Sequence, residues 1–303
     1  MKQQSALFNL LKPPGMTSHD VVDHVRRLLG QRRVGHAGTL DPAATGVLVV
    51  MVGRATRLSR YVTNYDKRYR FELTFGLATD TGDADGEVIE QADASGLTVR
   101  QVKEAISDLK GILRMKPHRY SAAKVDGQKA YELARQGEEP ELEERAVVIH
   151  EVTLLDFKSS ERPRALFEVH CGKGTYVRSL AEVIGHRVGS CALASFVLRT
   201  QVGPFSVNDA VTLEELGQAA EEENLAELAL PASVALSGYP RITVTPDQAR
   251  LLVHGNPVPI TGHHYVGELV AAYDADGNLV AMGEVLGQRP HVFQPRTVLA
   301  GGN

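Results

Sequence analysis

The chain has 303 residues, of which 43% are hydrophobic and 23% are charged, and its formal net charge is -4. This composition is typical of a soluble globular protein with one large domain and a small one. A membrane-spanning helix is not expected, because the longest apolar run, residues 47–52, is far too short to cross a bilayer.

The cysteines and the first residues indicate a compartment. Cys171 and Cys191 show neither the spacing of a metal site nor that of a redox motif. Residues 1–5 lack the apolar core and the cleavage site of a secretory signal. We therefore expect a cytoplasmic protein with reduced, buried thiols.

Charge is distributed unevenly along the chain. Residues 1–70 contain twelve Lys and Arg against four Asp and Glu, and residues 110–135 contain seven against two. By contrast, residues 211–230 carry six Glu and no basic residue. This segregation indicates a face that meets a polyanion, although basic residues scattered over solvated helix faces explain it equally well.

The first half of the chain carries alternating helix and strand signals. Apolar residues at helical spacing predict a helix that has Ser18 as its N-cap and Gly30 just past its end. Residues 47–52 predict a buried strand, and residues 70–75 alternate as a half-buried strand does. A second helix is expected to begin after Thr98.

The second half begins with an excursion and ends in a β-rich module. Residues 114–145 are basic at first and then rich in Glu, which indicates a departure from the core. Helices are expected over residues 176–188, 213–230 and 248–254. Strands are expected over residues 147–149, 152–157, 165–171, 193–198, 269–273 and 279–285, the last two joined as a hairpin. Because no regular βα rhythm or Gly-rich first turn is present, we predict an α+β fold with a mixed sheet.

One loop, residues 35–46, combines three glycines with a single acidic residue, Asp41. Glycine permits close backbone approach and unusual backbone angles, which a loop that holds a reacting group often needs. The competing interpretation is structural. Asp41 followed by Pro42 is also the usual start of a helix, with Asp as the N-cap and Pro in the first turn.

Several cofactor motifs fail on inspection. Residues 172–175 are not a phosphate-binding P-loop, because the upstream glycine is missing and Lys173 is followed by Gly174 instead of Ser or Thr. Residues 81–92 resemble a calcium loop but begin with Thr81 and end with Ala92 instead of Glu. The pair His263 and His264 has no thiol or HExxH partner. We therefore expect neither a cofactor nor a metal.

Four separated segments together supply lysine, acidic, aromatic and arginine residues, namely residues 12–18, 35–46, 66–70 and 173–178. Two more motifs join them in order, TDTGDADG over residues 79–86 and YSAAKVDG over residues 120–127. Together they resemble, over nearly the whole chain, the bacterial tRNA pseudouridine-55 synthases of the TruB family. So many motifs in register make the resemblance highly specific, unlike the Asp41 loop alone.

The resemblance implies a domain organisation. It predicts the pseudouridine-synthase fold, an α+β fold with a mixed, mainly antiparallel central sheet flanked by helices. The catalytic domain spans residues 1–238 and carries a thumb-like insertion over residues 114–145, and residues 239–303 form a PUA-like, β-rich RNA-binding domain. The basic thumb would close over the tRNA and contact phosphates without reading bases, so affinity should fall steeply with salt.

The resemblance also implies a reaction, the isomerisation of uridine-55 in the T-loop of tRNA to pseudouridine. The base is detached at N1, turned and rejoined through C5, after leaving its stack to be reached. Because substrate and product are isomers, no cofactor is required. The expected partner is the T-arm stem-loop of tRNA, with no membrane and no obligatory protein partner, and the enzyme is expected to be a monomer.

Two residues carry the expected chemistry. The resemblance makes Asp41 the nucleophile, and attack on ribose C1′ and attack on uracil C6 both stay open. It places Arg178 beside Asp41, where a guanidinium favours the carboxylate form and orients it. Without the resemblance, Arg178 is better interpreted as a surface residue on the first turn of a helix.

The remaining site residues are assigned to substrate binding. Tyr69 would stack on the flipped base, Tyr176 would reach the uracil or its C5 proton, and His36 would wedge into the T-loop. Read alone, Tyr69 is a strand residue at the core edge, Tyr176 a helix-start aromatic and His36 a solvated loop histidine. Lys12 would belong to the support or phosphate-contact shell, although an exposed Lys fits almost as well.

Two departures from the family pattern affect the pocket. Leu11 precedes Lys12 where the family usually has Asp. The family's Leu-Arg-Arg is replaced by Val197-Leu198-Arg199, so Val197 takes the place of a pocket-lining Leu and one Arg is lost. Three other functions remain as alternatives: an RNA-binding protein without catalysis, a guide-RNA-dependent pseudouridine synthase and, more remotely, a hydrolase that uses Asp41.

Overall fold

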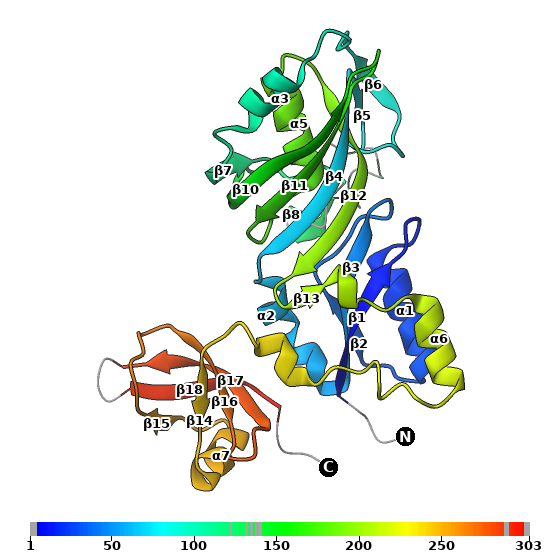
Figure 1. Ribbon diagram of the computed structural model, residues 1–303. Coiled ribbons are helices and arrows are strands. Elements are labelled where there is room, and N and C mark those ends of the chain that lie inside the picture. Colours follow the sequence, from blue (N-terminus) through cyan, green and yellow to red (C-terminus); the bar gives the residue numbers. More distant parts are fainter. Residues whose placement is uncertain are drawn as a thin grey trace.

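The computed structural model describes residues 5–287 and 291–299, apart from residues 121–122, 126, 131–132, 134–135, 137 and 139–140. Within these residues the chain forms a nine-stranded sheet, a five-stranded sheet and two short hairpins. Figure 1 shows the large sheet running the length of the main body, with the smaller sheet beside its lower end.

The nine-stranded sheet has the order β1-β3-β12-β4-β11-β10-β7, with β2 paired to β3 and β13 paired to β12. Its neighbours are antiparallel except β12 and β3, which are parallel where Leu198 meets Thr45. The strands are β1 Ala6–Lys12, β2 Val34–Ala37, β3 Thr45–Val52, β4 Lys67–Phe75, β7 Gly111–Met115, β10 Arg145–Lys158, β11 Arg164–Cys171, β12 Ala192–Val202 and β13 Phe205–Ser206. The mixed, mainly antiparallel sheet of the prediction is confirmed.

Helices cover this sheet in two groups. The α-helices among the described residues are α1 Ser18–Leu29, α2 Ser59–Thr63, α3 Val99–Ile106, α5 Val177–Arg187, α6 Leu213–Glu221 and α7 Pro246–Val253, of which α7 packs on the five-stranded sheet instead. Helices α3 and α5 lie together at the upper end of the sheet in Figure 1, while α1 and α6 lie at the lower end. Each group buries a separate apolar core, with Phe71 and Phe167 stacked in the first and Val21 and Leu48 in the second.

Two predicted helix boundaries differ from the structure. Thr17, not Ser18, caps α1, and its side chain and that of Asp20 form a capping box. The acidic helix α6 ends at Glu221 instead of residue 230, and Glu223 takes a positive φ of 58°. Consecutive glutamates at a helix C-terminus oppose the helix dipole, which disfavours a longer helix there.

The strands predicted over residues 147–149 and 152–157 are one strand, β10, interrupted by a bulge between Ile149 and Glu151. The bulge lets a single strand continue while one extra residue is accommodated. The hairpins β5 Leu77–Thr79 with β6 Val88–Gln91, and β8 Lys124–Val125 with β9 Gln128–Lys129, lie outside the large sheet.

The five-stranded sheet contains β14 Arg241–Thr243, β15 Val258–Ile260, β16 Leu269–Tyr273, β17 Leu279–Leu286 and β18 His291–Val298. The predicted hairpin is formed by β16 and β17, which pair antiparallel. Ala271, Tyr273 and Met282 of this sheet share a buried cluster with the main body, so the two sheets are joined by apolar packing. Among the described residues, no helix is long and apolar enough to span a membrane.

Candidate active site

A pocket of about 250 Å³ opens beside the loop that carries Asp41. This volume lies slightly below the range of about 300–1,000 Å³ that is typical for drug-sized ligands, as expected for a single base. The pocket is lined by residues of the Asp41 loop, of the end of α2, of β4, of the segment leading into α5 and its first turn, and of β12: Gly38, Thr39, Leu40, Asp41, Ala44, Thr63, Lys67, Tyr69, Gly172, Gly174, Thr175, Tyr176, Val177, Arg178, Val197 and Arg199.

Asp41 and Arg178 meet in this pocket. The Nη2 atom of Arg178 lies 2.8 Å from Oδ2 of Asp41, the distance of a charge-assisted hydrogen bond. The side chain of Arg178 is 6% exposed, whereas that of Asp41 is 39% exposed and faces the pocket. The surface position that Arg178 takes in the competing interpretation is therefore wrong.

The local sequence at Asp41 suggests the start of a helix, but no helix begins there in the structure. Its carbonyl accepts a hydrogen bond from the Ala44 backbone N–H, which closes a turn, and β3 begins at Thr45. Because β3 pairs with both β1 and β2, sheet pairing takes the residues that a helix would need. The turn presents the Asp41 carboxylate to Arg178.

Opposing effects act on the charge of Asp41. Burial raises the pKa of the Asp41 carboxyl group, and the nearby carboxylate of Asp83 acts in the same direction. The positive charge of Arg178 and its hydrogen bond lower the pKa and partly offset the effect of burial. The result is a carboxylate more basic than an exposed aspartate, with a fixed cation beside it.

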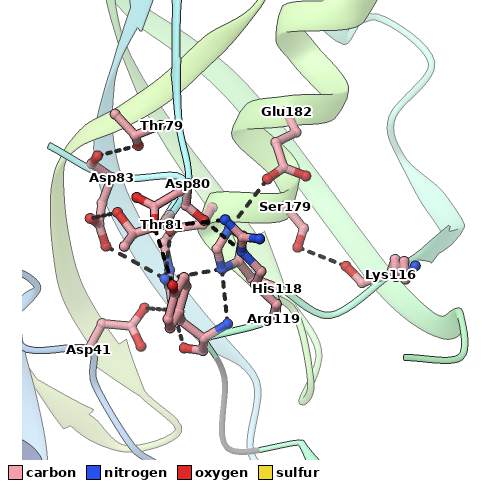
Figure 2. A network of polar contacts seen from close by, with 12 residues as sticks. Asp41, Thr79, Asp80, Thr81, Asp83, Lys116, His118, Arg119, Ser179 and Glu182 are labelled. Atoms are coloured by element: carbon pink, nitrogen blue, oxygen red, sulfur yellow. Dashed lines mark hydrogen bonds and ion pairs between the residues drawn. The ribbon is translucent and has the colours of Figure 1, made fainter. Parts of the chain in front are cut away.

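A network of backbone and side-chain groups fixes the guanidinium of Arg178, and Figure 2 labels Thr81, Asp83 and His118 among its members. Its Nη1 donates to the Thr81 carbonyl at 2.7 Å and lies 3.6 Å from Oδ2 of Asp83. Its Nη2 donates to the Tyr120 carbonyl at 2.9 Å. Contacts from the TDTGDADG segment and from the start of the YSAAKVDG segment therefore hold Arg178 in place and orient its guanidinium toward Asp41.

His118 supports the same guanidinium. Its Nδ1 accepts from the Tyr120 backbone N–H and lies 3.4 Å from Nη1 of Arg178. Both neighbours only donate, so Nε2 carries the ring proton, and it faces Oε1 of Glu182 at 3.7 Å (Figure 2). Burial and the charge of Arg178 lower the pKa of His118 to about 3, so the ring is neutral at physiological pH.

Arg199, which the sequence analysis did not assign to the site, shapes the Asp41 loop through its backbone. This side chain is 1% exposed and donates to the carbonyls of Val47, Thr39 and Gly38. Its strand also touches Gly46, where a Cβ atom would lie 2.3 Å from the Arg199 carbonyl oxygen. Gly46 has a φ of +112°, so glycine is required for both space and conformation.

Lys12 and Ser18 also hold the loop through its backbone. Lys12 is fully buried, and its Nζ donates to the carbonyls of Pro13, Met16 and Pro42. It does not line the pocket, so the support role fits the structure and the phosphate contact and the exposed position do not. The Ser18 hydroxyl donates to the Leu40 carbonyl and accepts from the Leu40 N–H, one residue before Asp41.

The other predicted residues divide into two groups. Tyr69, Tyr176 and Val197 line the pocket with Asp41 and Arg178. Tyr69 is 9% exposed, and burial raises the pKa of its phenol, which keeps it neutral. His36 is not among the pocket-lining residues; it lies on β2 opposite Val50, is half-buried, and burial lowers the pKa of its ring.

Two pocket-lining cations were missed, Arg199 and Lys67. Burial lowers the pKa of Lys67 to about 8, and its Nζ donates to the Thr63 and Tyr65 carbonyls. The sequence signal that could have identified Lys67 is the alternation of inward-facing and outward-facing residues along a strand. Lys67 and Tyr69 precede Phe71 at strand spacing and are buried on its face of β4, which identifies Lys67 as an inward-facing charge.

Comparison with known proteins decides the family. The family model described as "TruB family pseudouridylate synthase (N terminal domain)" matches residues 26–177. The chain is 51% identical over 249 residues to tRNA pseudouridine synthase B of Symbiobacterium thermophilum, which covers 82% of this chain and 81% of that protein. The protein of the same name from Pelotomaculum thermopropionicum is 42% identical, covering 98% and 97%. The chain belongs to the TruB family. It is thus a pseudouridine synthase, an isomerase.

Solved structures agree with the TruB family fold. A chain of an H/ACA RNP bound to a substrate RNA containing 2′-deoxyuridine superposes with a TM-score of 0.77 at 22% identity, over 98% of this chain and 85% of that one. A chain of the archaeal box H/ACA sRNP Nop10-Cbf5 complex gives 0.75 at 24% identity, over 97% and 85%. The predicted pseudouridine-synthase fold is confirmed.

Proposed function

We propose that this TruB family enzyme converts uridine-55 in the T-loop of tRNA to pseudouridine, with Asp41 as the nucleophile and without a cofactor. The observation that carries the proposal is the Asp41 carboxylate, 2.8 Å from the buried Arg178, inside a pocket that Tyr69 and Tyr176 also line. The names of the two bacterial relatives support tRNA as the substrate.

The target base enters the pocket after leaving the T-loop stack. Tyr69 offers an aromatic face for stacking, which is tolerant of the base's rotation because it uses no directional hydrogen bond. Val197 forms an apolar part of the lining. His36, on β2 outside the pocket lining, occupies the space that the base vacates in the T-loop.

The reaction exchanges one bond for another. Asp41 adds to the nucleoside at ribose C1′ or uracil C6, and the C1′–N1 bond breaks. After the base has turned, the C1′–C5 bond forms and the bond to Asp41 breaks, which releases the carboxylate. A proton then leaves C5, and N1 takes one up, so substrate and product have the same composition. Arg178 keeps Asp41 charged for the attack. Tyr176, at the start of α5, lies on the pocket wall to assist proton removal from C5.

RNA outside the pocket is held by two further parts of the chain. We assign residues 114–145 as a thumb that contacts the T-arm backbone, and residues 239–303 as a PUA-like domain that contacts the rest of the tRNA. The thumb begins at the residues that hold Arg178, since the Tyr120 carbonyl accepts from its guanidinium and the Ser179 hydroxyl donates to the Lys116 carbonyl. RNA affinity should therefore weaken steeply with salt.

The experiment uses the purified protein alone with an unmodified tRNA transcript, followed by mapping of pseudouridine at single-nucleotide resolution. The expected result is one pseudouridine at the T-loop uridine, formed without added metal, cofactor or protein. An isolated T-arm stem-loop should also be converted, which separates a stand-alone enzyme from a guide-RNA-dependent one. Pseudouridine at another position, or formed only with a guide RNA, contradicts the proposal.

A further inference from the structure

A cluster of two histidines and one aspartate lies outside the pocket lining. Asp66 directly precedes β4, His150 belongs to β10 and His170 belongs to β11, and these three strands are consecutive in the large sheet. One possible ligand atom from each residue lies within 4.8 Å of the other two. Among the described residues this is the single group of three or more potential metal-ligating side chains.

Sheet register brings the three residues together. His170 pairs with Arg68 and Cys171 with Lys67, so Asp66 follows at the end of the same ladder. On the other side, Glu151 pairs with His170, and the register shifts between Ile149 and Glu151. The bulge therefore falls on His150 and places its ring beside that of His170, with ring centroids 4.5 Å apart.

The histidine rings converge on one carboxylate oxygen. Nε2 of His150 lies 3.0 Å from Oδ2 of Asp66, and Nε2 of His170 lies 3.9 Å from the same atom. Although the first distance is short, Nε2 of His150 is buried and makes no hydrogen bond of acceptable geometry within the described residues. A buried ring nitrogen without a hydrogen bond is costly, unless another group satisfies it.

We propose that Asp66, His150 and His170 bind one divalent transition-metal ion of the zinc type. Two imidazoles and one carboxylate form a donor set that zinc accepts with a fourth position left to water. With bonds of about 2.0–2.2 Å, tetrahedral ligands lie roughly 3.3 Å apart. The separations of 3.0 and 3.9 Å bracket this value, so small side-chain rotations complete the site.

The local charges are compatible with a cation. Asp66 and Glu151 act on the His170 ring as negative charges, against the positive Arg68. Magnesium is a poor competitor, because it prefers oxygen ligands in octahedral geometry to imidazole.

The bound ion would tie together three neighbouring strands next to residues that line the pocket. Lys67 follows Asp66, and Gly172 follows Cys171 in the β11 register, and both line the pocket. None of the three proposed ligands does. The ion thus stabilises a pocket wall without contacting the substrate, and its binding is measured without RNA, independently of the proposed reaction.

The test uses tag-free, full-length protein stripped with a chelator and titrated with Zn²⁺ by calorimetry, and with Co²⁺ while visible absorption is recorded. We expect the protein to bind one equivalent of Zn²⁺, to give a visible absorption spectrum with Co²⁺ and to melt at a higher temperature with Zn²⁺ bound. Millimolar Mg²⁺ should leave Zn²⁺ binding unchanged. His150→Ala and His170→Ala should each weaken affinity by at least about tenfold. Asp66→Asn is the variant that least disturbs the fold.

The matched control is His264→Ala, because His264 also lies beside a carboxylate, that of Glu268 at 2.6 Å. This variant should bind Zn²⁺ as the unaltered protein does. Absence of stoichiometric binding overturns the proposal, as does binding that survives unchanged in His150→Ala, His170→Ala and Asp66→Asn. Loss of binding in the control in place of these variants assigns the ion to the five-stranded sheet and also overturns it.

Discussion

Two buried arginines contact the Asp41 loop, and they make different kinds of contact with it. Arg178 directs its guanidinium at a carboxylate, whereas the contacts of Arg199 to this loop are to backbone carbonyls. Arg178 therefore affects the charge of the candidate nucleophile, and Arg199 sets the path of the backbone that carries it. Buried cations of the same type thus separate into a chemical role and a folding role according to their acceptors.

Replacing Arg178 should have the largest effect on the chemical step. In Arg178→Met the Asp41 carboxyl group keeps its burial but loses the cation that lowers its pKa. We expect single-turnover pseudouridine formation at neutral pH to fall by at least about 100-fold. Arg178→Lys keeps the charge but not the forked geometry and should recover only part of the rate.

The control for Arg178 lies on the same helix. Arg187 pairs with Asp108 at the surface, away from the pocket-lining residues, and Arg187→Met should retain the rate within about threefold. Equal losses in Arg178→Met and Arg187→Met indicate a general defect of α5 and contradict the chemical role.

Replacing Arg199 should affect folding more than chemistry. Arg199→Met removes the donor to the buried carbonyl of Val47 and to the partly buried carbonyls of Gly38 and Thr39. We expect a loss of about 3 kcal/mol in stability, seen as a fall of roughly 6 °C in the melting temperature. A melting temperature equal to that of the unaltered protein contradicts this assignment.

The pH dependence of the rate sharpens the distinction further. Because the ionised Asp41 attacks and burial raises its pKa, the rate should decline as pH falls through a midpoint above that of an exposed aspartate. The midpoint should rise in Arg178→Met, which lacks the cation that lowers the pKa of Asp41, and stay in place in the control Arg187→Met. A midpoint in Arg178→Met equal to that of the unaltered enzyme refutes the pairing.

The smallest expected effect is at Val197, where the chain departs from the family. Val197 is half-buried and lines the pocket without a polar contact. Val197→Leu restores the larger residue and should change the single-turnover rate by less than about threefold. A change above tenfold means that the shape of this wall limits catalysis.

Much of the fold followed from local patterns, and the failures occurred where sheet pairing competed with them. The apolar run at residues 47–52 and the alternation at Phe71 gave correct strands. The helix start that competed with the catalytic interpretation of Asp41 and Pro42 is wrong, since a local pattern contains no information on the strands that pair with the residues from Thr45 onward. A bulge at His150 likewise divided one strand into two apparent ones.

The pairing of Asp41 with Arg178 was predictable only from the resemblance to the TruB family. The two residues lie so far apart along the chain that no spacing argument connects them, and Arg178 considered alone is interpreted as a surface residue. Arg199 and Lys67 were missed because a charge inside an apolar strand pattern was not taken as an inward-facing side chain. The proposed metal ligands were missed because three strands bring them together.

The central claim is that the carboxylate of Asp41 performs the reaction. Its most direct test compares the unaltered enzyme with Asp41→Asn, which preserves the size of the side chain, in a single-turnover assay on tRNA alongside tRNA binding. We predict that binding stays within about threefold while pseudouridine formation falls by at least about 10³-fold. Turnover near that of the unaltered enzyme contradicts the account.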